Sequence, residues 1–121
     1  MSFLGLVPDS SVASIEPRGG NEFISAEQFV ERLHLRFEEM ERTLARDEQL
    51  EVVAFLPSGK ALAVETIGYE NPALVVLHGQ EQDTGRPSTL LAHQSSVQVL
   101  VSVEPVLAGQ SRRILRFTKE K

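Results

Sequence analysis

The sequence predicts a mainly β domain with one N-terminal helix, in which five short antiparallel strands form a small, strongly bent barrel. Apolar residues recur every three or four positions between residues 26 and 44, and from residue 50 onward they alternate with polar residues or form short runs. The longest connection between these runs is the polar stretch 79–88. Because parallel neighbours need a linker of about a dozen residues, we expect an antiparallel meander. A helix that caps such a bent meander makes a partly open barrel.

The helix is expected to begin at Ser25, whose hydroxyl can cap free N–H groups while Gln28 completes a capping box. The following apolar residues share one stripe, at intervals of four and three positions: Ala26, Val30, Leu33, Phe37, Met40 and Leu44. The opposite face carries Glu and Arg, with Glu38 and Arg42 at the favourable i,i+4 spacing. The pattern indicates an amphipathic helix over 25–48 that docks on a sheet, or alternatively forms a short coiled coil.

Five strands follow, and we expect them at residues 50–56, 61–69, 73–78, 89–93 and 97–104, with a sixth, edge-type strand at 112–118. The third is continuously apolar, which is typical of a strand covered on both faces. Strict alternation in the second strand predicts one face with Leu62, Val64 and Thr66 and another with Ala63, Glu65 and Ile67. In the fifth strand, a shared face is predicted for Val97, Val99, Val101 and Val103.

The chain divides into three regions. Residues 1–24 are rich in Ser, Pro and Gly and are expected to form a flexible arm, whereas residues 25–107 hold the helix and the five strands. Residues 108–121 are a basic tail or an edge strand, with five Arg and Lys residues and one Glu in a chain of net charge −5. Such a tail could bind phosphate or acidic groups, or it could be an exposed last strand that aids solubility.

Composition excludes several classes of protein. The 121 residues are enough for one domain with its own core. The absence of cysteine excludes disulfides and thiolate zinc sites. An acidic balance argues against a protein that coats nucleic acid over its whole surface. The first residues lack a basic n-region, and no apolar run approaches the roughly 20 residues that span a bilayer. We therefore expect a cytoplasmic protein without membrane contact.

Two stretches within residues 25–105 resemble the Sm and Hfq-like family. The first contains FLPSGK at 55–60, IGYE at 67–70 and LVVL at 74–77, and it is similar to the first Sm motif. The second, LLAHQSSV at 90–97, resembles the Hfq segment in which a lysine–histidine pair precedes a short turn and the last strand. The resemblance implies a helix followed by five bent antiparallel strands, and a closed ring in which the fourth and fifth strands join neighbouring copies.

The resemblance also implies binding of single-stranded RNA, although the residues that serve it are only partly present. Asn71 falls near the position that contacts uridine, and His93 matches the Hfq histidine. Pro72 replaces the aromatic residue that stacks on bases, Leu74 replaces the asparagine that reads a base, and Ala92 replaces the lysine partner of the histidine. Stacking platforms and basic grooves are what single-stranded RNA needs, so these replacements weaken that expectation.

Catalytic and metal sites are not expected. The three histidines are the residues that titrate near neutrality. We interpret His34 as a boundary residue of the helix. A metal shared by His78 and His93 lacks a third ligand at usable spacing, and His93 with Ser95 lacks a carboxylate that would orient the imidazole. The prediction is therefore a protein that is not an enzyme and has no cofactor and no metal site.

Two functional hypotheses remain. The first is a ring-forming, non-catalytic Sm-like protein that acts as an oligomeric assembly or interaction module, with contacts between copies through strand edges, a protein partner on helix 25–48 and at most weak RNA binding. The alternative is a genuine Hfq-like protein that binds single-stranded RNA. Its candidate RNA-binding residues are Asn71, His93, Arg112, Arg113 and Arg116. The acidic body and the missing aromatic residue favour the first hypothesis.

Overall fold

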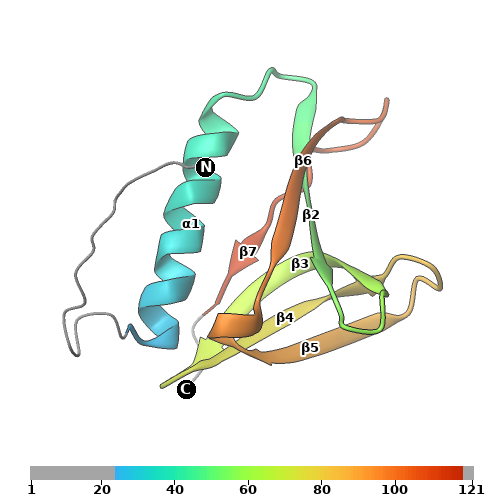
Figure 1. Ribbon diagram of the computed structural model, residues 1–121. Coiled ribbons are helices and arrows are strands. Elements are labelled where there is room, and N and C mark those ends of the chain that lie inside the picture. Colours follow the sequence, from blue (N-terminus) through green and yellow to red (C-terminus); the bar gives the residue numbers. More distant parts are fainter. Residues whose placement is uncertain (1–23, 119–121) are drawn as a thin grey trace, which may run out of the picture.

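One helix lies across a single β-sheet in the computed structural model, which describes residues 24–118 (Figure 1). The elements, in chain order, are α1 (Ala26–Arg42), β2 (Glu48–Phe55), β3 (Ala61–Glu70), β4 (Leu74–Glu81), β5 (Pro87–His93), the 3-10 helix η2 (Gln94–Ser96), β6 (Val99–Pro105) and β7 (Arg116–Phe117). The mainly β class with one N-terminal helix is thus confirmed. The arm predicted for residues 1–24 lies outside the described residues except for Ile24.

Helix α1 begins as predicted and ends earlier than predicted. The Ser25 hydroxyl accepts a hydrogen bond from the Gln28 N–H (3.2 Å), and the Gln28 side chain accepts one from the Ser25 N–H (3.0 Å), so the capping box is present. At the other end, both the N–H and the hydroxyl of Thr43 donate to the carbonyl of Met40 (3.1 and 2.8 Å). A threonine hydroxyl that takes up a helix carbonyl competes with further helical bonds, and the helix predicted to reach residue 48 therefore stops at Arg42.

The order of strands in the sheet is β5-β4-β3-β2-β6, so only β2 to β5 form a meander. β6 does not pair with β5. It runs antiparallel to β2 instead, from Glu48 opposite Pro105 to Ala54 opposite Val99. Short connections decide the direction of neighbouring strands but not which edge a later strand joins, and η2 carries the chain from β5 to the far side of β2. A helix followed by five antiparallel strands in this order is compatible with the Sm-like fold.

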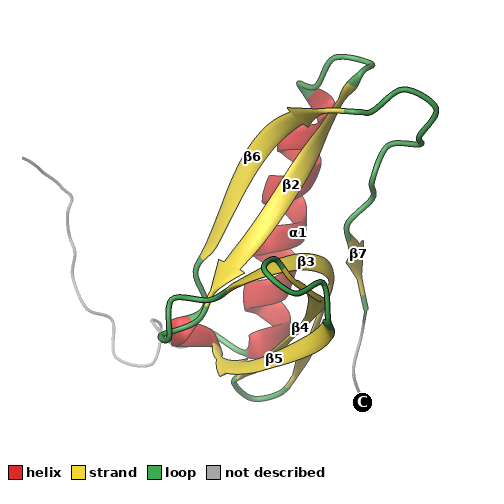
Figure 2. Cartoon of the chain, turned by 90° about the vertical axis from the view of Figure 1, so that its right-hand side faces the viewer, coloured by secondary structure: helices red, strands yellow, loops and turns green. Residues whose placement is uncertain are grey.

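The predicted barrel is wrong, because the sheet is neither closed nor strongly curled. Closure requires the first and last strands of the sheet to pair, and β5 and β6 remain separate ends. β3 also changes neighbours along its length: residues 61–63 pair with β2, whereas Thr66 and Ile67 pair with β7. Consequently β2 and β6 rise away from the layer formed by β3, β4 and β5 (Figure 2).

A β-bulge in β3 corrects the predicted faces of this strand. Val64 lies opposite Gly79 and Thr66 opposite His78, so Glu65 is an extra residue. The extra residue reverses the alternation, and Ile67 joins Val64 in the core instead of facing away from it. Gly79 is required at this point because a Cβ there would overlap the carbonyl oxygen of Ala63, and the Cα of Val64 would lie 3.0 Å away.

The core lies between α1 and the sheet. α1 packs over β3 and β4 (Figure 1). The buried apolar cluster consists of Ala26, Val30 and Phe37 from α1, Val52 and Ala54 from β2, Leu62, Val64, Ile67 and Tyr69 from β3, and Val75 and Leu77 from β4. Val76 is also buried, which confirms that the apolar strand β4 is covered on both faces. In β6, by contrast, Val103 is 57% exposed although it belongs to the predicted apolar face.

The C-terminal segment is a short parallel strand rather than the edge strand predicted for 112–118. Only Arg116 and Phe117 adopt strand geometry, and they pair parallel to Thr66 and Ile67 of β3. Thr118 donates a further backbone hydrogen bond to the Ile67 carbonyl (2.9 Å). Parallel pairing is accessible because the long connection after β6 brings the chain back along the helix side of the molecule (Figure 1).

Within residues 24–118, no helix is both long enough and apolar enough to cross a membrane.

Candidate functional site

Among the described strands, β5 and β6 form the two free edges of the sheet, and both carry exposed apolar side chains. Leu91 in β5 is 61% exposed, and Leu100 and Val103 in β6 are 55% and 57% exposed. Neither strand carries lysine or arginine. Edge strands are normally protected by such charges, by proline or by bulges. Pro87 lies only at the start of β5 and Pro105 at the end of β6, so the middle of each edge is free of these protections.

Asn71 and His93, two of the predicted RNA-binding residues, line the same open cavity. Its volume is about 400 Å³, and its other lining residues are Glu70, Pro72, Ala73 and Leu74. The Asn71 side-chain oxygen accepts a hydrogen bond from the Glu27 N–H (3.0 Å), and the Pro72 carbonyl accepts one from the Ala26 N–H (2.7 Å). The β3–β4 turn therefore holds the N-terminus of α1, which is a structural role for Asn71 beside any role in binding.

His93 is positioned by the turn that follows it. Its Nδ1 accepts a hydrogen bond from the Ser95 N–H (3.1 Å) and lies 2.9 Å from the Ser95 hydroxyl, so the imidazole caps η2. His78 lies 2.9 Å from the hydroxyl of Thr89 instead. In the β4–β5 ladder, His93 is opposite Leu74 and Thr89 is opposite His78. These two rows are four strand positions apart, roughly 13 Å, which is too far for one metal to bind both imidazoles.

The arginines of the basic tail lie at the other end of the molecule, beside the loop that joins α1 to β2. The Arg112 guanidinium donates to the carbonyls of Ala45 (2.9 Å) and Arg46 (3.5 Å). Arg113 forms an ion pair with Glu104 at the end of β6 (2.8 Å). The structure thus brings Asn71 and His93 together and separates them from Arg112 and Arg113, while Arg116 lies in β7.

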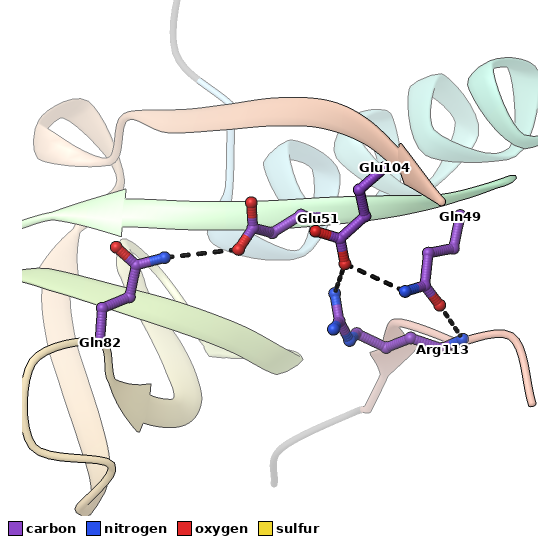
Figure 3. A network of polar contacts seen from close by, with 5 residues as sticks. All are labelled: Gln49, Glu51, Gln82, Glu104 and Arg113. Carbon is purple, nitrogen blue, oxygen red and sulfur yellow. Dashed lines mark hydrogen bonds and ion pairs between the residues drawn. The ribbon is translucent and has the colours of Figure 1, made fainter. Parts of the chain in front are cut away.

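A polar network holds Arg113 in place and contains a residue that the sequence interpretation missed. Gln49 is only 5% exposed; its amide nitrogen donates to Glu104 (3.0 Å), and its amide oxygen accepts the backbone N–H of Arg113 (2.7 Å) (Figure 3). The same Glu104 oxygen binds the Arg113 guanidinium. Gln49 lies on the face of β2 opposite the core residues Val52 and Ala54, and a glutamine that is buried there is costly without partners. The sequence carried no signal for this burial, because the predicted strand begins at residue 50 and leaves Gln49 outside it.

Tyr69 is the one titratable group whose environment clearly changes its pKa among residues 24–118. Burial beneath α1 raises the pKa of its phenol, and Glu27 raises it further by its charge and by accepting a hydrogen bond, with a smaller effect of Glu31. Within the same residues, no group of three or more His, Asp or Glu side chains is arranged to hold a metal ion.

Comparisons of the chain with protein-family models, with curated proteins and with solved structures found no match. The edges of the sheet, the cavity at Asn71 and His93 and the basic tail are therefore the features that bear on function.

Proposed function

We propose that this protein is a non-catalytic assembly module whose copies join through the free edges of the sheet, with β5 of one copy adding to β6 of the next. The observation that carries the proposal is the pair of edge strands that no other strand within residues 24–118 covers, with exposed Leu91, Leu100 and Val103. Each edge presents unpaired backbone N–H and C=O groups, and strand addition satisfies these groups while it covers the leucines. The Sm-like resemblance implies the same pair of strands and a ring as the product.

The lengths and charges of the two edges are compatible with this pairing. β5 and β6 have seven residues each. The charged residue of β6, Glu104, is already bound to Arg113 and Gln49 and so is not an unpaired charge at the joint. Because the same two edges recur in every copy, the contact is head-to-tail, and it closes into a ring when the rotation between copies allows it.

Light scattering behind a sizing column tests the proposal. The wild-type chain is expected at two or more times the 13.4 kDa of one copy. Leu91→Lys and Leu100→Lys should each shift the population toward monomer, since a lysine at an edge opposes strand addition. Leu35→Lys is the matched control, because Leu35 is similarly exposed (62%) but lies on α1. A wild-type monomer at high protein concentration would contradict the proposal.

RNA binding is the second candidate, and the cavity shared by Asn71 and His93 is the observation that favours it. Arg112 and Arg113 are already occupied by protein groups, which makes a large phosphate-binding surface at the tail less favourable. The test is binding of a labelled oligouridylate at several salt concentrations, since phosphate contacts give a steep salt dependence. His93→Ala should weaken binding if the cavity is used; equal affinity of wild type and variant would remove the cavity from the RNA hypothesis.

A further inference from the structure

The segment that follows β6 is attached to the rest of the molecule through separate anchors rather than through a continuous strand. At one end, the Arg112 guanidinium binds carbonyls of the α1–β2 loop, and Arg113 binds Gln49 and Glu104 through its backbone and its side chain. At the other end, Phe117 packs beside α1 and β3. Between the anchors, Ile114 is 69% exposed, whereas Leu115 is half-buried against the core. The segment therefore resembles a bound peptide that contacts its receptor through the two arginines at one end and through Leu115 and Phe117 at the other.

The groove that receives Phe117 belongs to the folded body. The phenyl ring stacks on His34 (centroids 4.2 Å apart, planes 15° apart) and lies 5.8 Å from the ring of Phe37. A cavity of about 210 Å³ adjoins it, lined by Glu27, Val30, Glu31, His34, Tyr69, Phe117 and Thr118. All these groups except Phe117 and Thr118 come from α1 and β3, so the receptor side of the groove does not depend on the segment for its position.

Charge complements this packing. The receptor side presents Glu104 at the arginine site and Glu27 and Glu31 beside the aromatic site. The segment 112–118 contributes three arginines and no acidic residue. A basic segment with an aromatic residue four positions after its second arginine is therefore the ligand chemistry that this groove selects.

The linker between β6 and residue 112 allows the segment 112–118 to leave its site. The Val106 N–H donates to the Asp47 carbonyl (2.8 Å), and this bond ties the chain at the end of β6. Residues 107–111 are then all exposed, with one internal turn closed by Gln110 and Leu107 and with Gly109 at φ +82°. Five extended residues span at most about 18 Å. Rotation in this linker can redirect the segment without disturbing β6.

We infer that residues 112–118 form an exchangeable strand, and that the arginine site at Gln49 and Glu104 together with the groove between α1 and β3 accepts this segment from a second copy of the chain. A released segment uncovers Phe37 and Val30 and leaves Gln49 and Glu104 without their arginine partner, so an empty groove is unfavourable. The same segment of another copy restores every contact with identical chemistry. This exchange uses a surface different from the β5 and β6 edges and does not depend on strand-edge assembly.

A mixing experiment with two complementary variants tests the exchange. The acceptor carries Arg113→Ala and Phe117→Ala, so its groove is intact and its own segment is impaired. The donor carries Glu104→Gln and His34→Ala, so its segment is intact and its groove is impaired. Both also carry Leu91→Lys and Leu100→Lys, which remove edge contacts from the readout. The chain has no cysteine, so Asp83→Cys in the exposed β4–β5 loop allows one dye to be attached to the acceptor.

The anisotropy of the labelled acceptor should rise when donor is added. The donor concentration at half-saturation should be at least about tenfold lower than the concentration of unlabelled acceptor that gives the same rise. A synthetic peptide of residues 110–118 should reverse the rise, and the same peptide with alanine at positions 113 and 117 should not. Circular dichroism checks that each variant is folded. If a variant is not, the acceptor carries only Arg113→Ala and the donor only Glu104→Gln in place of the double substitutions. Equal titrations with donor and acceptor would overturn the exchange, as would a groove that binds the peptide but not the donor.

Discussion

The imidazole of His34 stacks on the ring of Phe117, with centroids 4.2 Å apart and ring planes inclined by 15°. These residues are far apart in the sequence, and their contact joins the middle of α1 to the last described strand. His34 also lies 3.3 Å from Glu38 one helical turn later. The flank of the helix, which the sequence marks only as a boundary between apolar and charged faces, is therefore the surface on which the C-terminal segment docks.

Replacing His34 with alanine should loosen that segment without unfolding the domain. An aromatic pair contributes about 0.5–1.5 kcal/mol, so protection of the Thr118 amide, which donates to the Ile67 carbonyl (2.9 Å), should fall by up to about tenfold. Amide hydrogen exchange followed by NMR measures this change. Leu35→Ala is the matched control, because Leu35 is the exposed neighbour of His34 and should leave the amide protected. Unchanged protection in His34→Ala would mean that the stack does not stabilise the segment.

Gly79→Ala should destabilise the protein through a backbone clash. The new Cβ would overlap the Ala63 carbonyl oxygen across the bulge, and backbone cannot move aside cheaply, so we expect a loss of about 3 kcal/mol or more in the free energy of unfolding. Gly85→Ala is the control: φ is +75° there and nothing lies within 4 Å of the new Cβ, so the cost is only the roughly 1–2 kcal/mol of a left-handed conformation. Urea denaturation of both variants checks the order, and a smaller loss for Gly79→Ala would contradict the described bulge.

Asn71 should contribute to stability in the absence of any RNA. Its side-chain oxygen accepts the Glu27 N–H in the first turn of α1, and loss of such a capping interaction costs about 1 kcal/mol. Asn71→Ala should therefore lower the free energy of unfolding by that amount. Asn71→Asp keeps an acceptor and places a negative charge at the helix N-terminus, where it is favourable, so it should be as stable as wild type. Thermal unfolding distinguishes the two; equal stability of all three chains would leave Asn71 without this structural role.

Tyr69 should link stability to alkaline pH. Since burial and the neighbouring Glu27 raise its pKa in the folded state, the folded protein prefers the neutral phenol. The contribution is fully present below the unfolded pKa of about 10 and is lost as pH rises through the higher folded value. The chain has one Tyr and no Trp, so the absorbance of phenolate reports this residue alone. The titration midpoint of Tyr69 in the folded protein should lie above its midpoint in the unfolded chain, and Glu27→Gln should bring the two midpoints closer. A folded-state midpoint at or below the unfolded value would contradict the burial of Tyr69.

Some parts of the candidate site could be predicted from the sequence because they depend on neighbouring residues. The capping box at Ser25 and the turn after His93 involve groups two or three positions apart. The contacts that give Asn71 and Arg113 their positions could not be predicted. Asn71 bonds to a residue 44 positions away, and Arg113 to one 64 positions away. A residue type alone does not say which distant donor or acceptor the fold brings to it.

The sequence by itself determined the class of the fold: one amphipathic helix followed by short strands whose connections force antiparallel pairing. Local rules suffice there, because helix capping, periodicity and loop length act over a few residues. Only the tertiary structure decided that β6 joins β2, that the bulge at Glu65 turns Ile67 into the core and that the sheet stays open. These outcomes depend on which edges and faces can be covered together, and that competition is settled by packing across the whole domain rather than by any one segment.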